Sequence, residues 1–118
     1  MILADTSVWV EHFRRGDRRL AAALEDERVL MHPFVLGELA CGNLHNRSEV
    51  LHLLMQLPAA HIASDDEVLA FIERRGLASR GIGLVDAHLL ASSVLTPFAQ
   101  LVTLDRRLAR IAAELCVA

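Results

Sequence analysis

Four acidic residues stand out because each one interrupts or ends an apolar segment. Asp5 follows an apolar run at the start of the chain, Asp86 lies inside a second apolar stretch, and Asp105 ends a third. Glu38 is the only charged residue between positions 28 and 47. If the fold brings these carboxylates together, they form an acidic pocket suited to a hard divalent cation and to hydrolysis of a phosphodiester bond.

Carboxylates crowded into one pocket need a counter-charge. Two unit charges about 4 Å apart repel by about 4 kcal/mol at an effective dielectric of about 20. All 12 basic residues are Arg, so the chain has no Lys to place among the acids. The sequence therefore favours Mg²⁺ or Mn²⁺, which bind carboxylates together with water molecules.

Hydroxyl groups close to the acids in sequence are candidates for an accessory role. Thr6, Ser7 and Thr103 could hold a carboxylate or a water molecule in place. Helix capping and strand packing are alternative roles for all three.

Each acid alone also has an ordinary structural explanation. Asp5 or Asp105 could be a turn or cap residue after a strand, and Asp86 could cap its helix. Glu38 could be a partly exposed helix residue. The joint pattern indicates a shared site. Each of the four acids interrupts or ends an apolar segment, at a position where an α/β sheet would present it to one cleft.

Alternating strands and helices are expected to position the acids. Apolar runs predict strands at residues 2–4, 28–31, 61–63 and 101–104. Helices are predicted from Thr6 or Ser7 onward and at 18–26, 33–41, 48–57, 64–78, 87–95 and 106–115, with a capping box at Ser64 and Glu67. This alternation favours an α/β fold with a parallel sheet and helices on both faces.

Length and composition set further expectations. The 118 residues suit one domain spanning 1–118, and 53% of them are hydrophobic. No signal peptide or membrane span is indicated, so a cytoplasmic protein is expected. Cys41 and Cys116 are predicted to be small core residues in a reducing compartment. The helix at 48–57 has more apolar residues than one stripe, so it is expected to be deeply buried or packed against a partner chain.

Four segments together resemble the PIN domain, and more closely the VapC-type toxins of type II toxin–antitoxin pairs. They are Ile-Leu-Ala-Asp-Thr-Ser at 2–7, Gly-Glu-Leu-Ala at 37–40, Gly-Leu-Val-Asp-Ala-His-Leu-Leu-Ala at 83–91 and Thr-Leu-Asp-Arg-Arg-Leu at 103–108. The resemblance covers nearly the whole chain.

The resemblance implies a three-layer α/β/α sandwich with a mainly parallel sheet of four to five strands. It implies a Mg²⁺- or Mn²⁺-dependent endoribonuclease, a hydrolase that forms a homodimer and is blocked by a cognate VapB-like antitoxin. Asp5, Glu38, Asp86 and Asp105 match the family's catalytic and metal-binding acids. Thr6, Ser7 and Thr103 match its accessory hydroxyl positions.

Other residues carry weaker signals. Arg106 and Arg107 directly follow a proposed catalytic acid, so we expect them to contact RNA phosphates, although a solvated helix face is an alternative. The six His residues are expected to have surface or packing roles, and His88 to point away from Asp86.

Competing functions are less compatible with the sequence. Receiver-like phosphoacceptors and haloacid-dehalogenase-type phosphatases both need a Lys, and the second class needs an Asp where Ser7 stands. A non-catalytic PIN-like scaffold would be expected to have lost at least one of the four acids, and all four are present.

Overall fold

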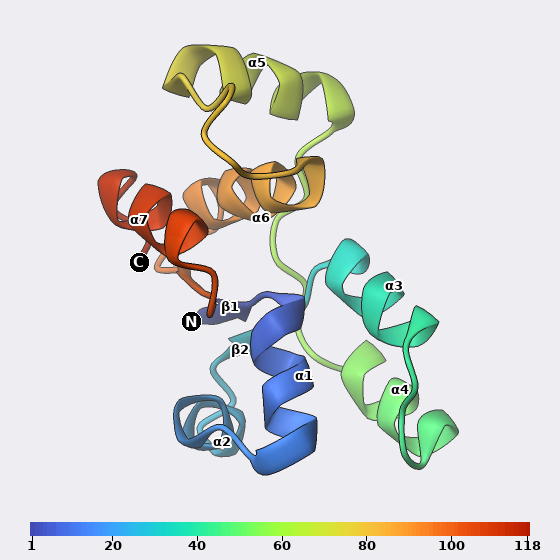
Figure 1. The fold of residues 1–118 in the computed structure, drawn as a ribbon. Helices are drawn as coiled ribbons and strands as arrows, with labels where there is room; N and C mark the ends of the chain where they lie inside the picture. The colour runs from blue at the N-terminus through green and yellow to red at the C-terminus, as the bar shows by residue number, and fades with distance from the viewer.

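A three-stranded parallel sheet lies at the centre of the computed structural model, which describes residues 1–118 (Figure 1). Strand β1 (Ile2–Ala4) lies between β2 (Val29–Leu30) and β3 (Gln100–Val102). Leu3 pairs with Leu30 on one side and with Leu101 on the other. All three residues of β1 are buried, as expected for an uninterrupted apolar run in a central parallel strand.

Seven helices surround the sheet. They are α1 (Thr6–Arg15), α2 (Arg18–Glu25), α3 (Pro33–Cys41), α4 (Arg47–Met55), α5 (Asp65–Arg75), α6 (Leu84–Leu95) and α7 (Arg106–Glu114). Figure 1 shows α1 and α2 on one side of the strands and α6 and α7 on the other, with α3 and α4 beside α1. The expected α/β/α arrangement is confirmed.

The strand order explains the layers. β2 and β3 lie on opposite sides of β1. The chain therefore crosses the sheet in one direction from β1 to β2 and in the opposite direction from β2 to β3. Right-handed crossovers then place the connecting helices on opposite faces. The segments that follow β1 and β3 therefore leave neighbouring strand ends and run to different layers. The crevice between two such segments is where α/β proteins bind ligands.

The sheet has fewer strands than the four to five that were expected. Ala59 forms only an isolated parallel bridge with Met31, because the neighbouring Pro58 has no N–H to donate to a ladder. The strand predicted at 61–63 is absent, and the His61 N–H instead donates to Thr96 Oγ1 at 2.9 Å. At the other edge, only the Val117 carbonyl accepts from Leu101 N–H, at 2.6 Å.

Most helix predictions are confirmed, including the capping box of Ser64 and Glu67 at the start of α5. Helix α6 begins at Leu84, three residues earlier than predicted, so Asp86 lies in its first turn. None of the helices is both long enough and apolar enough to cross a bilayer.

Two expectations about burial need correction or refinement. Cys41 and Cys116 are both exposed, so the prediction that they are core residues is wrong. They lie at the end of α3 and just after α7, where the chain turns outward. In α4 only Leu54 is buried, whereas Leu53 and Met55 are 57% and 68% exposed. The apolar face of α4 is thus left open rather than deeply buried.

Candidate active site

Asp5 is the most buried of the four acids and lies directly after β1. Only 7% of its surface is exposed. One carboxylate oxygen caps α1 by accepting from Val8 N–H at 3.2 Å, and it also accepts from Ser7 Oγ at 2.5 Å. The other oxygen accepts from Thr103 Oγ1. Asp5 therefore acts as a helix cap and is also held in a fixed orientation by two hydroxyl groups.

Asp105 occupies the equivalent place after β3. Its Oδ1 accepts from the N–H groups of Arg107 and Leu108, at 2.8 and 3.1 Å, and so caps α7. Thr103 Oγ1, which donates to Asp5, accepts from Asp105 N–H at 3.0 Å. One side chain thus connects the two acids that follow the neighbouring strands.

Glu38 reaches the same region from α3. It is an exposed residue, and its Oε1 accepts from Thr6 Oγ1 at 2.7 Å. Thr6 is the residue after Asp5, so this hydrogen bond ties α3 to the start of α1. All three predicted hydroxyl residues, Thr6, Ser7 and Thr103, therefore donate to one of the acids.

Asp86 completes the group from the first turn of α6. Its Oδ2 accepts from Gly83 N–H at 3.4 Å. Burial raises the pKa of the Asp86 carboxyl above its ordinary range, and the charges of Asp5, Asp105 and Glu38 raise it further. The hydrogen bond from Gly83 opposes this rise in pKa. Asp5, Asp105 and Glu38 therefore all lie within electrostatic reach of Asp86.

The loop before α6 is held by α7. Arg80 forms two hydrogen bonds with the Glu114 carboxylate, at 2.8 and 2.9 Å. Gly81 has a φ of +83°, and a Cβ there would lie 2.7 Å from a guanidinium nitrogen of Arg107. The positive φ favours Gly at this position, and the absence of a side chain lets the exposed Arg107 lie over the loop. These contacts fix the start of α6 and hence the place of Asp86.

Arg106 and Arg107 are both exposed. Neither forms an ion pair with any of the four acids. Arg107 lies over Gly81, beside the loop that leads to Asp86. The two guanidinium groups are therefore free to meet an anionic ligand at the rim of the acidic group.

The donor atoms suit a hard divalent cation. The four acids and their three hydroxyl partners offer only oxygen ligands, and no Arg forms an ion pair with these carboxylates. No group of three His, Cys, Asp or Glu side chains lies close enough together to hold a metal ion. Mg²⁺ does not need such a group, because it is usually held by one or two carboxylates and keeps several of its waters. The residues present fit such an ion.

Two of the six histidines, His32 and His88, have structural roles in this fold. His32 is 1% exposed and caps α3, where its Nδ1 accepts from Phe34 N–H at 3.0 Å. His88 is also buried, and its ring packs against Phe34 with centroids 4.6 Å apart. Sequence reasoning assigned these residues to packing, but it missed the cap. The signal was available, since a polar residue directly before a Pro at the first helical position is a typical N-cap.

Known proteins match this chain over nearly its whole length. The family model for the PIN domain matches residues 2–114. Two proteins named Ribonuclease VapC32, from Mycobacterium tuberculosis strains CDC 1551 / Oshkosh and ATCC 25618 / H37Rv, are each 48% identical to this chain over 118 residues. Each alignment covers 100% of this chain and 95% of the relative.

Proposed function

This chain belongs to the PIN-domain family, among its VapC-type ribonucleases, and on that premise we propose that its four acids bind a divalent cation to cleave RNA. The chain is the endoribonuclease toxin of a toxin–antitoxin pair. The proposed cofactor is Mg²⁺ or Mn²⁺, and the proposed metal-binding and catalytic residues are Asp5, Glu38, Asp86 and Asp105.

The observation that carries the proposal is the gathering of three carboxylates around Asp86 without a paired base. Burial, and then the charges of Asp5, Asp105 and Glu38, raise the pKa of Asp86, and no Arg side chain pairs with any of the four carboxylates. Such a cluster is costly unless a cation or a bound proton offsets it. A catalytic metal site explains why the chain keeps this arrangement.

The chain's own residues would divide the work as follows. Asp5 and Asp86 are the strongest candidates to hold the cation, with Asp105 and Glu38 nearby. When bound, a divalent cation lowers the pKa of an attacking water and neutralises charge on the phosphate. Thr103 and Ser7 would fix the two oxygens of Asp5, and Thr6 would orient Glu38 toward the same point. Arg106 and Arg107 would bind flanking phosphates.

RNA cleavage by the purified protein, freed of antitoxin, tests this function. We expect cleavage with Mg²⁺ or Mn²⁺ that stops on addition of EDTA. Asp5→Asn should lower the rate more than about 100-fold, because even loss of an outer-shell partner of a metal site costs about 10- to 100-fold. Asp66→Asn, an exposed acid of α5, is the matched control and should cleave normally. Full activity of Asp5→Asn would contradict the proposal.

The proposed protein partner is a VapB-like antitoxin that covers the acidic group. An open reading frame for a small DNA-binding protein directly upstream of the gene would support this partner. An isolated gene, or a co-expressed upstream product that leaves RNA cleavage unchanged, would count against it.

We also propose that residues 1–118 act as one PIN-like domain in the cytoplasm and pair into a homodimer through α4. The support for pairing is the open apolar face of this helix, where Leu53 and Met55 are mostly exposed. Light scattering should give twice the 13.0 kDa chain mass, and Leu53→Glu should shift it toward the monomer. A monomeric mass for the wild type at micromolar concentration would refute the homodimer.

A further inference from the structure

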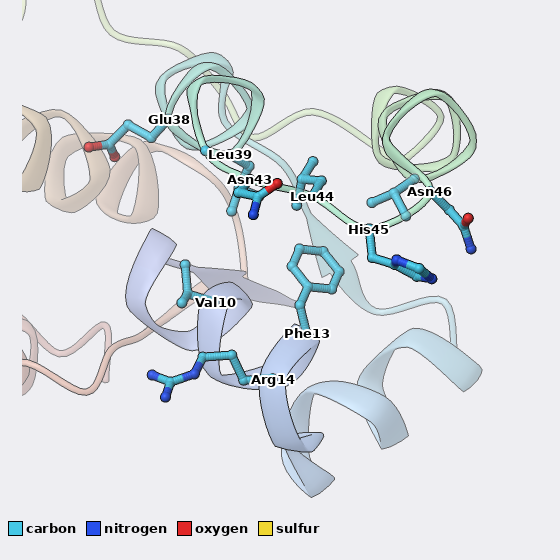
Figure 2. A pocket seen from close by; sticks show the side chains of 11 residues that line it. Val10, Phe13, Arg14, Glu38, Leu39, Asn43, Leu44, His45 and Asn46 are labelled. Atoms are coloured by element: carbon cyan, nitrogen blue, oxygen red, sulfur yellow. The ribbon is translucent and has the colours of Figure 1, made fainter.

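A pocket of about 520 Å³ lies next to the acidic group, between α1, α3 and the loop that joins α3 to α4. Figure 2 shows the side chains that line it. Glu38 belongs to both the pocket and the acidic group. In Figure 2 its carboxylate points away from the pocket interior, to the same side as the Arg14 guanidinium. Glu38 therefore borders the pocket with its stem and the acidic group with its carboxylate.

One face of α1 connects the two regions. Thr6, which holds Glu38, is followed at helical spacing by Val10 and Phe13, and both of these line the pocket. Seven residues of helix correspond to about 10 Å, or about three stacked nucleotides along one strand. A nucleotide close to the cleaved bond would reach the pocket.

Phe13 offers an aromatic ring in this pocket. It is 41% exposed, and Figure 2 shows its ring standing between α1 and the loop that carries Asn43 and Leu44. The ring also borders a second hollow of about 240 Å³ on the side of Trp9 and Leu54. The ring packs against the rings of Trp9 and His12, with centroids 5.8 and 6.0 Å away, and its exposed part faces the larger pocket, where it can stack with a planar ligand.

The loop opposite Phe13 offers polar groups without partners. The side chains of Asn43, His45 and Asn46 all line the pocket, and none of them makes a hydrogen bond within the protein. The loop is nevertheless held firmly, because the Arg47 guanidinium donates to the carbonyls of Ala40 and Gly42. Amide groups presented on a fixed loop can read the edge of a base, since each amide both donates and accepts.

Arg14 supplies the positive charge. Its neighbour Arg15 pairs with Glu11 at 3.7 Å, whereas Arg14 has no acidic partner. Arg14 lines the pocket, and its guanidinium points to the same side as the Glu38 carboxylate (Figure 2). A guanidinium in this position suits a backbone phosphate between the bound base and the cut.

From these observations we infer that the pocket binds one unpaired nucleobase of the RNA, about three nucleotides from the phosphate that is cleaved. Phe13 stacks on the base, Asn43 and Asn46 contact its edge, and Arg14 binds the connecting phosphate. Five of the 11 lining residues are hydrophobic and the others include Arg14, Asn43 and Asn46, so the pocket offers both the apolar surface and the polar groups that a nucleobase needs. The inference rests on the proposed ribonuclease function and assigns base selection to this pocket.

Base preference at the cleavage site tests the inference. A single-stranded RNA pool of random sequence is cut by the wild type, Phe13→Leu and Asn43→Ala, and the new ends are sequenced. We expect both variants to lose preference at one position about three nucleotides from the cut while retaining cleavage. Phe98→Leu is the matched control, because Phe98 is 92% exposed in the turn before β3, and it should keep the wild-type preference.

Affinity gives a second measurement that does not depend on turnover. In an Asp5→Asn background, a fluorescent random-sequence RNA octamer should bind about tenfold more weakly after Phe13→Leu, as expected for loss of one base–aromatic stack. Arg14→Gln should weaken binding of all sequences alike and reduce its salt dependence, whereas Arg15→Gln should not. Thermal melting of each variant separates these effects from loss of folding.

The outcomes distinguish the two proposals. If the wild type cuts RNA but Phe13→Leu and Asn43→Ala keep its base preference and affinity, the base-binding pocket is overturned and the hollow is left as a protein-docking groove. If the wild type neither binds nor cuts RNA under any metal condition, the proposed function itself fails, and the pocket inference fails with it.

Discussion

Thr103 joins the two acids that follow the neighbouring strands β1 and β3. Its hydroxyl donates to Asp5 and accepts from the backbone of Asp105. We predict that Thr103→Val lowers the rate of RNA cleavage about 10- to 100-fold, because one of the two Asp5 carboxylate oxygens loses its hydrogen-bond donor. Thr103→Ser keeps the hydroxyl and should retain most of the rate. Single-turnover cleavage of one RNA substrate measures both variants, and a Val variant as active as the Ser variant would disprove this role.

At the residue scale, sequence reasoning predicted which residues belong to the acidic group but not how each one is held. Asp5 and Asp105 were expected either to cap helices or to form a site, and they do cap α1 and α7 while lying near the other acids. The bond between Thr6 and Glu38 could not be predicted. It joins positions 32 residues apart and depends on how α3 packs against α1.

At the element scale, the start of α3 depends on a buried imidazole. Burial and, to a smaller extent, the charge of the nearby His88 lower the pKa of His32 from 6.5 to about 4. Below pH 6.5 the imidazole of the unfolded chain takes up a proton, while that of the folded protein stays neutral to about pH 4. His32 therefore stabilises the fold above pH 6.5, and this contribution is lost as the pH falls toward 4.

We predict that the free energy of unfolding falls more steeply over this pH range in the wild type than in His32→Asn. Between pH 6.5 and 4, the free energy of unfolding should fall by about 3 kcal/mol more in the wild type than in His32→Asn, since each unit of pKa corresponds to about 1.4 kcal/mol. Asn keeps a side-chain acceptor for the α3 cap, although it leaves a smaller side chain in the core. Urea unfolding at a series of pH values measures both proteins, and parallel pH profiles would show that His32 does not titrate in this way.

Helices were easier to predict than edge strands. The capping box of α5 and the Pro at the start of α3 are local signals, and both helices begin where these signals indicated. The edge strands depend on backbone pairing between distant segments. Pro58 lacks a donor and His61 donates to Thr96 instead, so the pairing at Met31 ends after one bridge.

At the scale of the whole molecule, strand order creates the site. With β1 between β2 and β3, the segments after β1 and β3 diverge to opposite faces, and each leads into a helix capped by an acid. The alternation of strands and helices predicted the parallel sheet and its layers. The order 2-1-3 was not predicted, because any order of three buried strands has the same apolar pattern.

Binding of Mn²⁺ to the protein free of antitoxin tests the central claim most directly. The claim is that carboxylates from four separate elements form one divalent-metal site. Isothermal titration calorimetry should show saturable binding to the wild type and to Asp66→Asn, and binding weakened more than about 100-fold in Asp5→Asn and in Asp86→Asn. Equal affinity of all four proteins for Mn²⁺ would contradict the claim.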